Sequence, residues 1–162
     1  ILLQRFSFRL VWFDLDMARS YFKLPIKDIK VAVTALVDEC VLVELGGGYI
    51  LQSDTELIKN CTAEPSKSVY AMHRNDFLVK AHEHILKDKY HHAYPDTLYY
   101  LLIDGQFQGA VVGKFRYTPE LEDVMLDLPA DEAAARKDEI LEAVQAICSW
   151  CQPPKRYLGE EL

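Results

Sequence analysis

Residues 24–51, LPIKDIKVAVTALVDECVLVELGGGYIL, predict a helix that leads directly into a two-stranded hairpin. Pro25 suits the first turn of a helix, where its missing N–H is not needed. Apolar residues then recur at helical spacing and form one face, at Ile26, Ile29, Val33, Leu36, Val37 and Cys40. Two β-prone runs, VLVEL and YIL, flank Gly46, Gly47 and Gly48, a pattern that indicates a hairpin. A helix followed by such a hairpin is typical of the end of a winged helix.

The residues before this stretch predict the remaining elements of the same module. LLQRF at 2–6 is interpreted as the end of a helix, and FRLVWF at 8–13 as a short strand. Asp14 is a good N-cap for a second helix, whose apolar residues are Met17, Ala18, Tyr21 and Phe22. A turn follows before Pro25, because the residue preceding a proline avoids helical geometry. We therefore expect residues 1–51 to form a winged helix-turn-helix.

The helix that starts at Pro25 is, by its position in this order, the recognition helix. Its side opposite the apolar face carries Lys27, Lys30, Val31 and Thr34. We expect the lysines to meet phosphates, Thr34 to reach a base edge or a thymine methyl group, and the wing at Gly46, Gly47 and Gly48 to add a contact. Asp28 and Asp38 on the same helix oppose binding to DNA. These charges are equally well interpreted as a solvated surface of a protein-interaction module.

The net charge of −7 is concentrated in the C-terminal part of the chain. Residues 1–51 and 52–117 are each neutral, whereas residues 118–162 contain four basic and eleven acidic side chains. The chain therefore lacks the strongly basic character of most nucleic-acid-binding domains, and only a local basic face is available. No apolar run reaches about 18 residues and no signal peptide is present, so we expect a cytoplasmic protein with no membrane contact. Because the chain opens on Ile1 inside an apolar pattern, we expect it to be a fragment of a longer protein.

The remaining residues predict a connecting segment and a second unit. Residues 52–68 are polar, with one helical turn expected at TELIKN, and residues 69–162 form the second unit. Helices are predicted over 75–90 and 131–151, from their apolar spacing. Strands are predicted over TLYYLLID and FQGAVVGKFRY, joined by the favoured turn Asp104-Gly105, with a third strand over 122–128 and an edge strand in KRYLGEEL. The fold class is therefore α+β, a winged helix-turn-helix followed by an antiparallel β-meander with two packed helices.

Neither a cofactor nor a metal site is predicted. The histidines (His73, His82, His84, His91 and His92) are close in sequence, but no two have the i, i+4 spacing that brings ligands together on a helix. Cys148 and Cys151 form a C-x-x-C at the expected C-terminus of a helix, whereas reactive dithiols sit at helix N-termini. We expect them to be reduced core cysteines. No catalytic constellation is present, so we expect no catalytic activity in this chain.

The predicted winged helix and the hairpin YYLLIDGQFQGAVVG at 99–113 together resemble a bacterial DNA-binding family. This is the winged-helix family that includes the DNA glycosylases unhooking interstrand crosslinks. The resemblance covers residues 1–128 and includes a D-G-x-x-x-G turn at Asp104–Gly109. It implies a DNA-binding module of a larger bacterial repair or regulatory protein, with double-stranded DNA as the partner.

The chain departs from this family at the catalytic motif. The family's glycosylases use a Gln-x-Gln pair in an N-terminal region, which this chain lacks. Gln106 and Gln108 repeat that spacing in a different part of the fold. Glycosylase activity is therefore not expected. Two alternatives stay open, namely a protein-interaction module on the winged-helix scaffold without DNA binding, and a non-catalytic fragment of a glycosylase-like enzyme.

Overall fold

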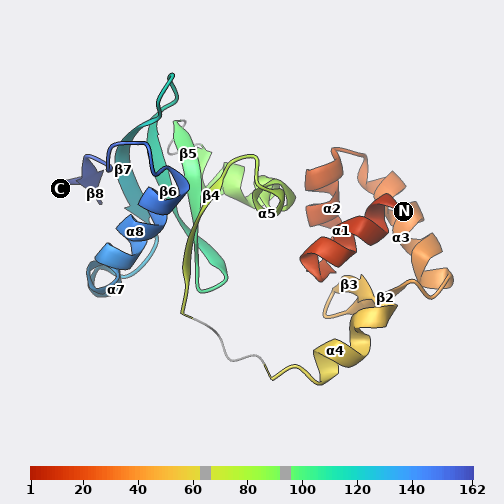
Figure 1. Ribbon diagram of the computed structural model, residues 1–162. Helices are drawn as coiled ribbons and strands as arrows, with labels where there is room; N and C mark the ends of the chain where they lie inside the picture. The colour runs from red at the N-terminus through yellow and green to blue at the C-terminus, as the bar shows by residue number, and fades with distance from the viewer. Residues whose placement is uncertain (63–66, 92–95) are drawn as a thin grey trace. The chain divides into compact units, whose positions relative to one another are not determined.

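A computed structural model describes residues 1–62, 67–91 and 96–162, and divides the chain into two compact units (Figure 1). The first unit holds Ile1–Glu64 together with Lys80–His84, and the second holds Pro65–Val79 and Ile85–Leu162. Helices and antiparallel strands occur in both units, so the predicted α+β class is confirmed. Within the described residues, no helix has the length and apolar character needed to cross a membrane.

The first unit has the element order expected for residues 1–51. The elements are α1 (Leu2–Leu10), β1 (Trp12–Phe13), α2 (Leu15–Phe22), α3 (Ile26–Asp38), β2 (Leu42–Leu45) and β3 (Gly48–Leu51). They are followed by η1 (Gln52–Asp54) and α4 (Thr55–Lys59), where one helical turn was expected. The strands form an antiparallel sheet in the order β1-β3-β2.

Aromatic and aliphatic side chains from these elements form one core. The Phe6 and Phe13 rings meet edge to face at 5.2 Å between centroids. Ile29 and Val33 from α3, with Leu42 and Ile50 from the hairpin, are also buried. Asp14 caps α2 as predicted, since its Oδ1 accepts a hydrogen bond from the Met17 N–H at 2.7 Å.

The strand predicted over residues 8–13 is wrong in extent. Helix α1 continues to Leu10, and only Trp12 and Phe13 pair with β3. The chain turns at Val11, whose φ is 66°. Leu3 and Phe6 are buried at helical spacing, and this tertiary packing overrides the β-propensity of the aromatic and branched residues that follow.

A Schellman motif ends α3, with Cys40 in the left-handed conformation that favours glycine. The Val41 N–H donates to the Leu36 carbonyl and the Cys40 N–H to the Val37 carbonyl, both at 2.9 Å. Cys40 has a φ of 56°. Its side chain is exposed, so Cys40 does not belong to the buried face of α3 as predicted. The left-handed turn carries it away from that face.

The second unit is built on a sheet with the strand order β4-β5-β6-β7-β8-β9. The strands are β4 (Val69–His73), β5 (Thr97–Ile103), β6 (Gln106–Lys114), β7 (Glu120–Leu126), β8 (Arg156–Tyr157) and β9 (Glu160–Glu161). The predicted antiparallel meander is present as β5, β6 and β7. The sheet is not wholly antiparallel, because β8 runs parallel to β7. Helices connect these two strands, which is how a parallel pair is joined.

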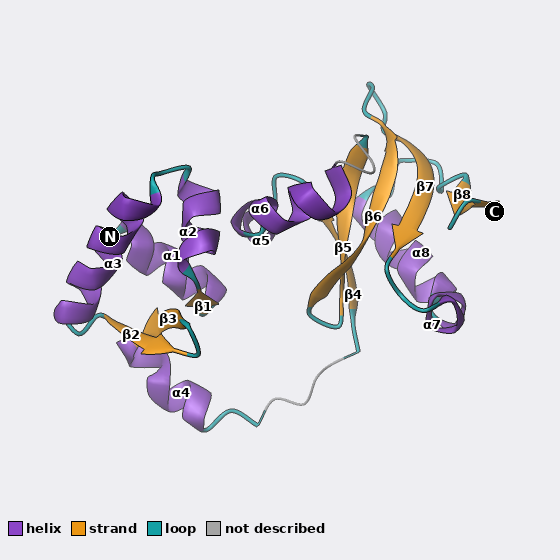
Figure 2. Ribbon diagram, turned by 180° about the vertical axis from the view of Figure 1, so that it is seen from behind, coloured by secondary structure: helices purple, strands orange, loops and turns teal. Residues whose placement is uncertain are grey.

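Strand β5 lies between β4 and β6 and is buried on both faces. Tyr99, Leu101 and Ile103 pack in the larger core, together with Ile140 and Val144 of the C-terminal helix. Tyr100 points to the opposite face, where it packs with Val79, Leu86 and Tyr90. Figures 1 and 2 show helical segments on the two sides of this sheet. A strand enclosed in this way accounts for the nearly continuous apolar run from Leu98 to Ile103.

The two helices predicted in this unit are each interrupted. Residues 75–90 form α5 (Phe77–Ala81), α6 (Glu83–Leu86) and the π-helical turn η2 (Lys87–His91). The wider π turn places Tyr90 in the core, where only 2% of its surface is exposed. Residues 131–151 form α7 (Ala130–Ala135) and α8 (Lys137–Ile147), which are separated at Arg136.

Arg136 interrupts this helix where its side chain reaches the predicted Asp104-Gly105 turn. Its guanidinium forms two hydrogen bonds with the Asp104 carboxylate, at 2.6 and 3.2 Å, and two with the Glu139 carboxylate, at 2.9 and 3.3 Å. The Ser68 N–H also donates to Asp104, at 2.7 Å. The Arg136 guanidinium, followed by the Ser68 N–H, holds the pKa of Asp104 below its usual value. The turn is therefore joined to both β4 and the α7–α8 junction.

We expect Cys40→Gly to stabilise the first unit by about 0.5–1 kcal/mol, because glycine adopts the left-handed conformation without the Cβ penalty. Urea unfolding followed by circular dichroism measures the change. Cys40→Ala is the matched control, since it removes the thiol but keeps the penalty, and it should give little gain. Equal stability for the two variants would contradict the assigned strain at Cys40.

The depressed pKa of Asp104 predicts a stability that depends on pH. The ionised Asp104 carboxylate contributes fully to the free energy of unfolding above the pKa of an unfolded aspartate, about 3.9. This contribution is lost as the pH falls through the lower pKa that Asp104 has in the folded protein. Wild type should therefore exceed Asp104→Asn in unfolding free energy at pH 6, and this difference should shrink at pH 3. Urea titrations at the two pH values test this. An advantage of wild type over Asp104→Asn that is the same at the two pH values would contradict the assigned role of the Asp104 carboxylate.

Candidate nucleic-acid interface

The solvent-facing side of α3 carries the side chains predicted to contact DNA. Lys27, Lys30 and Thr34 are all exposed, and Val31 between them is 72% exposed. Spacings of three and four residues place these side chains on one side of the helix. Ile29 and Val33 are buried, so the core holds the opposite side. The structure therefore brings the predicted α3 residues together on one surface.

The charges on this surface differ along the helix. Neither Lys27 nor Lys30 forms an ion pair with any residue that the structure describes. Asp38 is exposed near the C-terminal end of α3, and Glu39 follows it. The N-terminal half of α3 also carries the positive end of the helix dipole. Both lysines therefore lie in the N-terminal half of α3, together with the exposed Asp28, and this is the half that a recognition helix directs at base edges.

The β2–β3 hairpin presents few polar contacts of its own. Gly46 and Gly47 form its turn with φ values of 60° and 80°, as a type I′ turn requires. Both glycines are exposed, and so are Glu44 and Leu45 before them. The hairpin tip therefore offers backbone groups next to a carboxylate, and no cationic side chain.

Gly48 differs from the other two glycines because it is buried beneath Trp12. A Cβ atom at this position would overlap the Trp12 ring and approach the Phe13 carbonyl oxygen at 2.7 Å. The Trp12 indole N–H donates to the Leu45 carbonyl at 2.8 Å. Gly48 therefore allows Trp12 to hold the hairpin, and its own surface faces the protein.

The second unit presents an aromatic and cationic group that sequence reasoning missed. The loop between β6 and β7 projects from the sheet (Figure 1), and it carries Phe115, Arg116 and Tyr117. Phe115 is 66% exposed and Tyr117 is fully exposed. Residues 107–117 were predicted as one strand, but β6 ends at Lys114. The sequence feature that could have predicted this loop is the order aromatic, cation, aromatic directly before Thr118-Pro119. A proline at that position is typical of a turn.

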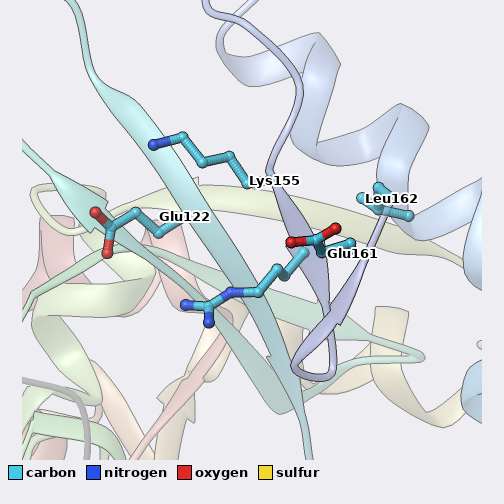
Figure 3. Close-up of a pocket in the computed structure, with 5 residues that line it drawn as sticks. Glu122, Lys155, Glu161 and Leu162 are labelled. Atoms are coloured by element: carbon cyan, nitrogen blue, oxygen red, sulfur yellow. The ribbon is translucent and has the colours of Figure 1, made fainter.

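A hollow of about 610 Å³ lies beside the C-terminal strands and is lined by charged side chains (Figure 3). Glu122, Lys155, Arg156, Glu161 and Leu162 line it. Lys155 extends toward Glu122 in Figure 3. A hydrogen bond from Lys114, together with the charges of Lys155 and Arg156, lowers the pKa of Glu122. Because the cations face carboxylates, this hollow has no net preference for an anion.

An apolar groove of about 490 Å³ lies between α1 and α3 in the first unit. Leu2 and Leu24 are exposed on its sides, and the small residues Ala32 and Ala35 line it from α3. Asp28 also lines this groove, and its i, i+3 spacing to Val31 places it at the border of the lysine surface. Exposed apolar surfaces of this kind are common at protein contacts.

Metal ligands do not gather in the part of the chain that the structure describes. No group of three or more His, Cys, Asp or Glu side chains is close enough there to hold an ion. His73, His82 and His84 are described, whereas His92 and the side chain of His91 lie outside the described residues.

Comparisons of the chain with protein-family models, with curated proteins and with solved structures find no match.

Gly48→Ala should destabilise the first unit by about 1–3 kcal/mol, because the added methyl group displaces the Trp12 ring from a filled site. Urea unfolding should show the loss, and tryptophan emission should shift to longer wavelength as Trp12 becomes solvated. Gly46→Asn is the control, since asparagine tolerates the left-handed conformation and the site is open. An unchanged emission and midpoint for Gly48→Ala would contradict the assigned contact.

Proposed function

We propose that this chain is a DNA-binding winged-helix module of a larger bacterial repair or regulatory protein that acts in the cytoplasm. The observation that carries this proposal is the exposed surface of α3, where two lysines without ion partners among the described residues precede Val31 and Thr34. An order of helix, strand, helix, helix and hairpin supports it, since this arrangement suits insertion of the third helix into a major groove.

In this mode of binding, Lys27 and Lys30 contact phosphates and Thr34 contacts a base edge or a thymine methyl group. The backbone of Gly46 and Gly47 approaches the neighbouring groove. Helix α3 has neither arginine nor asparagine, the residues that most often form two hydrogen bonds to one base. We therefore propose weak sequence preference, with affinity that depends mainly on phosphate contacts and on salt.

The β6–β7 loop is proposed as a separate contact on the second unit. Phe115 and Tyr117 expose flat rings that can stack on bases, and Arg116 lies between them in the sequence. Among the described residues, Arg116 pairs with Glu120 at 3.8 Å, a distance too long and a site too exposed to hold the guanidinium firmly.

A protein-interaction module without DNA binding is the second candidate. Two observations favour it, namely the apolar groove between α1 and α3 and the carboxylates Asp38, Glu39 and Glu44 near the hairpin. Those carboxylates would repel a phosphate backbone, and the groove would accept an apolar partner surface.

Fluorescence anisotropy of a labelled 20–30 base-pair duplex separates these candidates. DNA binding predicts an affinity that falls as the salt concentration rises. Replacing both Lys27 and Lys30 by alanine should reduce the log–log salt slope by about 1.8, because each phosphate contact contributes about 0.9. The Thr34→Ala variant should leave the slope unchanged.

Lys59→Ala is the matched control, because Lys59 lies on α4 and pairs with Glu56 at 2.8 Å. It should change the slope by much less than either α3 lysine. An identical slope for wild type and the double variant would exclude α3 as the contact. A folded protein that shows no binding at low salt would exclude DNA binding by this chain and favour the protein-interaction module.

A further inference from the structure

The C-terminal end of α8 contains a pair of cysteines whose pairing differs from the sequence expectation. Cys148 and Cys151 were expected to be reduced, and the structure joins them in a disulfide with their Cα atoms 5.3 Å apart. Helix α8 ends at Ile147, and Cys148 leaves helical geometry with φ −135° and ψ 59°. The turn that follows brings the two side chains together. Cys40 and Cys61 are free and exposed.

This turn is held by polar contacts that do not involve sulfur. The Gln145 side-chain amide donates to the carbonyls of Cys148 and Cys151, at 3.3 and 3.2 Å. The Cys151 N–H also donates to the Cys148 carbonyl at 2.9 Å. The two cysteines are therefore kept close whether or not their sulfur atoms are bonded. A pair held in this way can lose and regain its disulfide without separating.

We propose that Cys148 and Cys151 are a reversible redox site, and that their oxidation state controls the order of the β8–β9 hairpin. Both side chains are buried in the core of the second unit, next to residues such as Val144 and Tyr157. Reduced cysteines are compatible with the same core, because a thiol packs as a small apolar group. The reactants are small-molecule thiols and disulfides.

The exchange begins at Cys151, which retains 5% exposure, whereas Cys148 is fully buried. An external thiolate attacks the Cys151 sulfur and forms a mixed disulfide. The electron pair of the broken bond stays on the Cys148 sulfur, which then takes a proton from water. A second external thiol displaces Cys151 as a thiol. Two external thiols become one disulfide, and the protein gains two hydrogen atoms.

Reduction replaces one sulfur–sulfur bond by two thiols that pack as separate apolar groups, so the side chains of this turn shift as they repack. A close-packed core transmits such a displacement. The link from Cys151 to Lys155 is short, with only Gln152, Pro153 and Pro154 between them. The two prolines restrict its backbone, so the link cannot absorb a shift of Cys151 freely. Lys155 begins the last segment, where its N–H donates to the Leu121 carbonyl at 3.2 Å.

The β8–β9 hairpin is anchored by Tyr157, which is buried beside the cysteines and donates its hydroxyl to the Ala133 carbonyl at 2.7 Å, and by the Arg156–Asp123 ion pair at 3.6 Å. A shift of the cysteines therefore reaches the hairpin through Tyr157. Strand β8 pairs with β7 over Arg156 and Tyr157 only. The Leu158 N–H donates to the Val124 carbonyl at 2.9 Å, and the Gly159 N–H to the Asp123 carboxylate at 3.3 Å. We therefore expect faster opening of these hydrogen bonds when the disulfide is reduced.

The test uses the full chain with Cys40→Ser and Cys61→Ser, so that only the proposed pair reacts. The folded protein is equilibrated with mixtures of reduced and oxidised glutathione, quenched with acid, alkylated with N-ethylmaleimide and weighed. We expect two adducts at reducing ratios and none at oxidising ratios. Either two adducts at every ratio or none at every ratio would overturn the proposal.

Hydrogen exchange at residues 155–161 then tests control of the hairpin. The reduced form should exchange these amide hydrogens at least several-fold faster than the oxidised form. A variant that also carries Cys148→Ser and Cys151→Ser should match the reduced form at every glutathione ratio. Equal exchange in the two forms would overturn the proposed control of the hairpin even if the disulfide forms.

Discussion

The burial of Ile29 and Val33 determines the rotation of α3 about its own axis. This rotation decides which α3 side chains face solvent, and the candidate DNA-contacting surface depends on it. With 3.6 residues per turn, burying these two side chains directs Lys27, Lys30 and Thr34 to solvent. The sheet that encloses this core needs Gly48 beneath Trp12, which in turn holds the hairpin through Leu45. The exposed cationic surface is therefore a consequence of how the core is filled.

Strand β5 has the corresponding role in the second unit. Strand β5 is buried on both faces, so helices must cover both sides of the sheet. The chain therefore has to cross from one side of the sheet to the other to provide these helices. The cross-over through α7 and α8 explains why β8 returns parallel to β7. Arg136 then joins the α7–α8 junction to the Asp104 turn, which links the edge of the crossover to the centre of the sheet.

The charges of the two units suggest different roles. Several cations on the second unit face a carboxylate, as Lys114 faces Glu122 and Arg156 faces Asp123. The lysines of α3 have no such partner among the described residues, so they can contribute to binding a phosphate backbone. The disulfide at the end of α8 lies in the second unit, whereas the α3 lysines lie in the first. In the proposed redox control, its oxidation state determines the order of the C-terminal strands β8 and β9.

Local patterns in the sequence determined the order of most elements, the cap at Asp14, the Asp104-Gly105 turn and the residues that α3 exposes. These features depend on neighbours within a few positions, so periodicity and turn chemistry are sufficient to find them. Tertiary packing alone decided the short β1, the interruption at Arg136 and the pairing of Cys148 with Cys151. The first two depend on partners distant in sequence, since β1 pairs with β3 and Arg136 reaches Asp104, whereas the two cysteines are only three residues apart and pair where α8 ends. Local propensity cannot report such partners, because burial and pairing are properties of the folded chain.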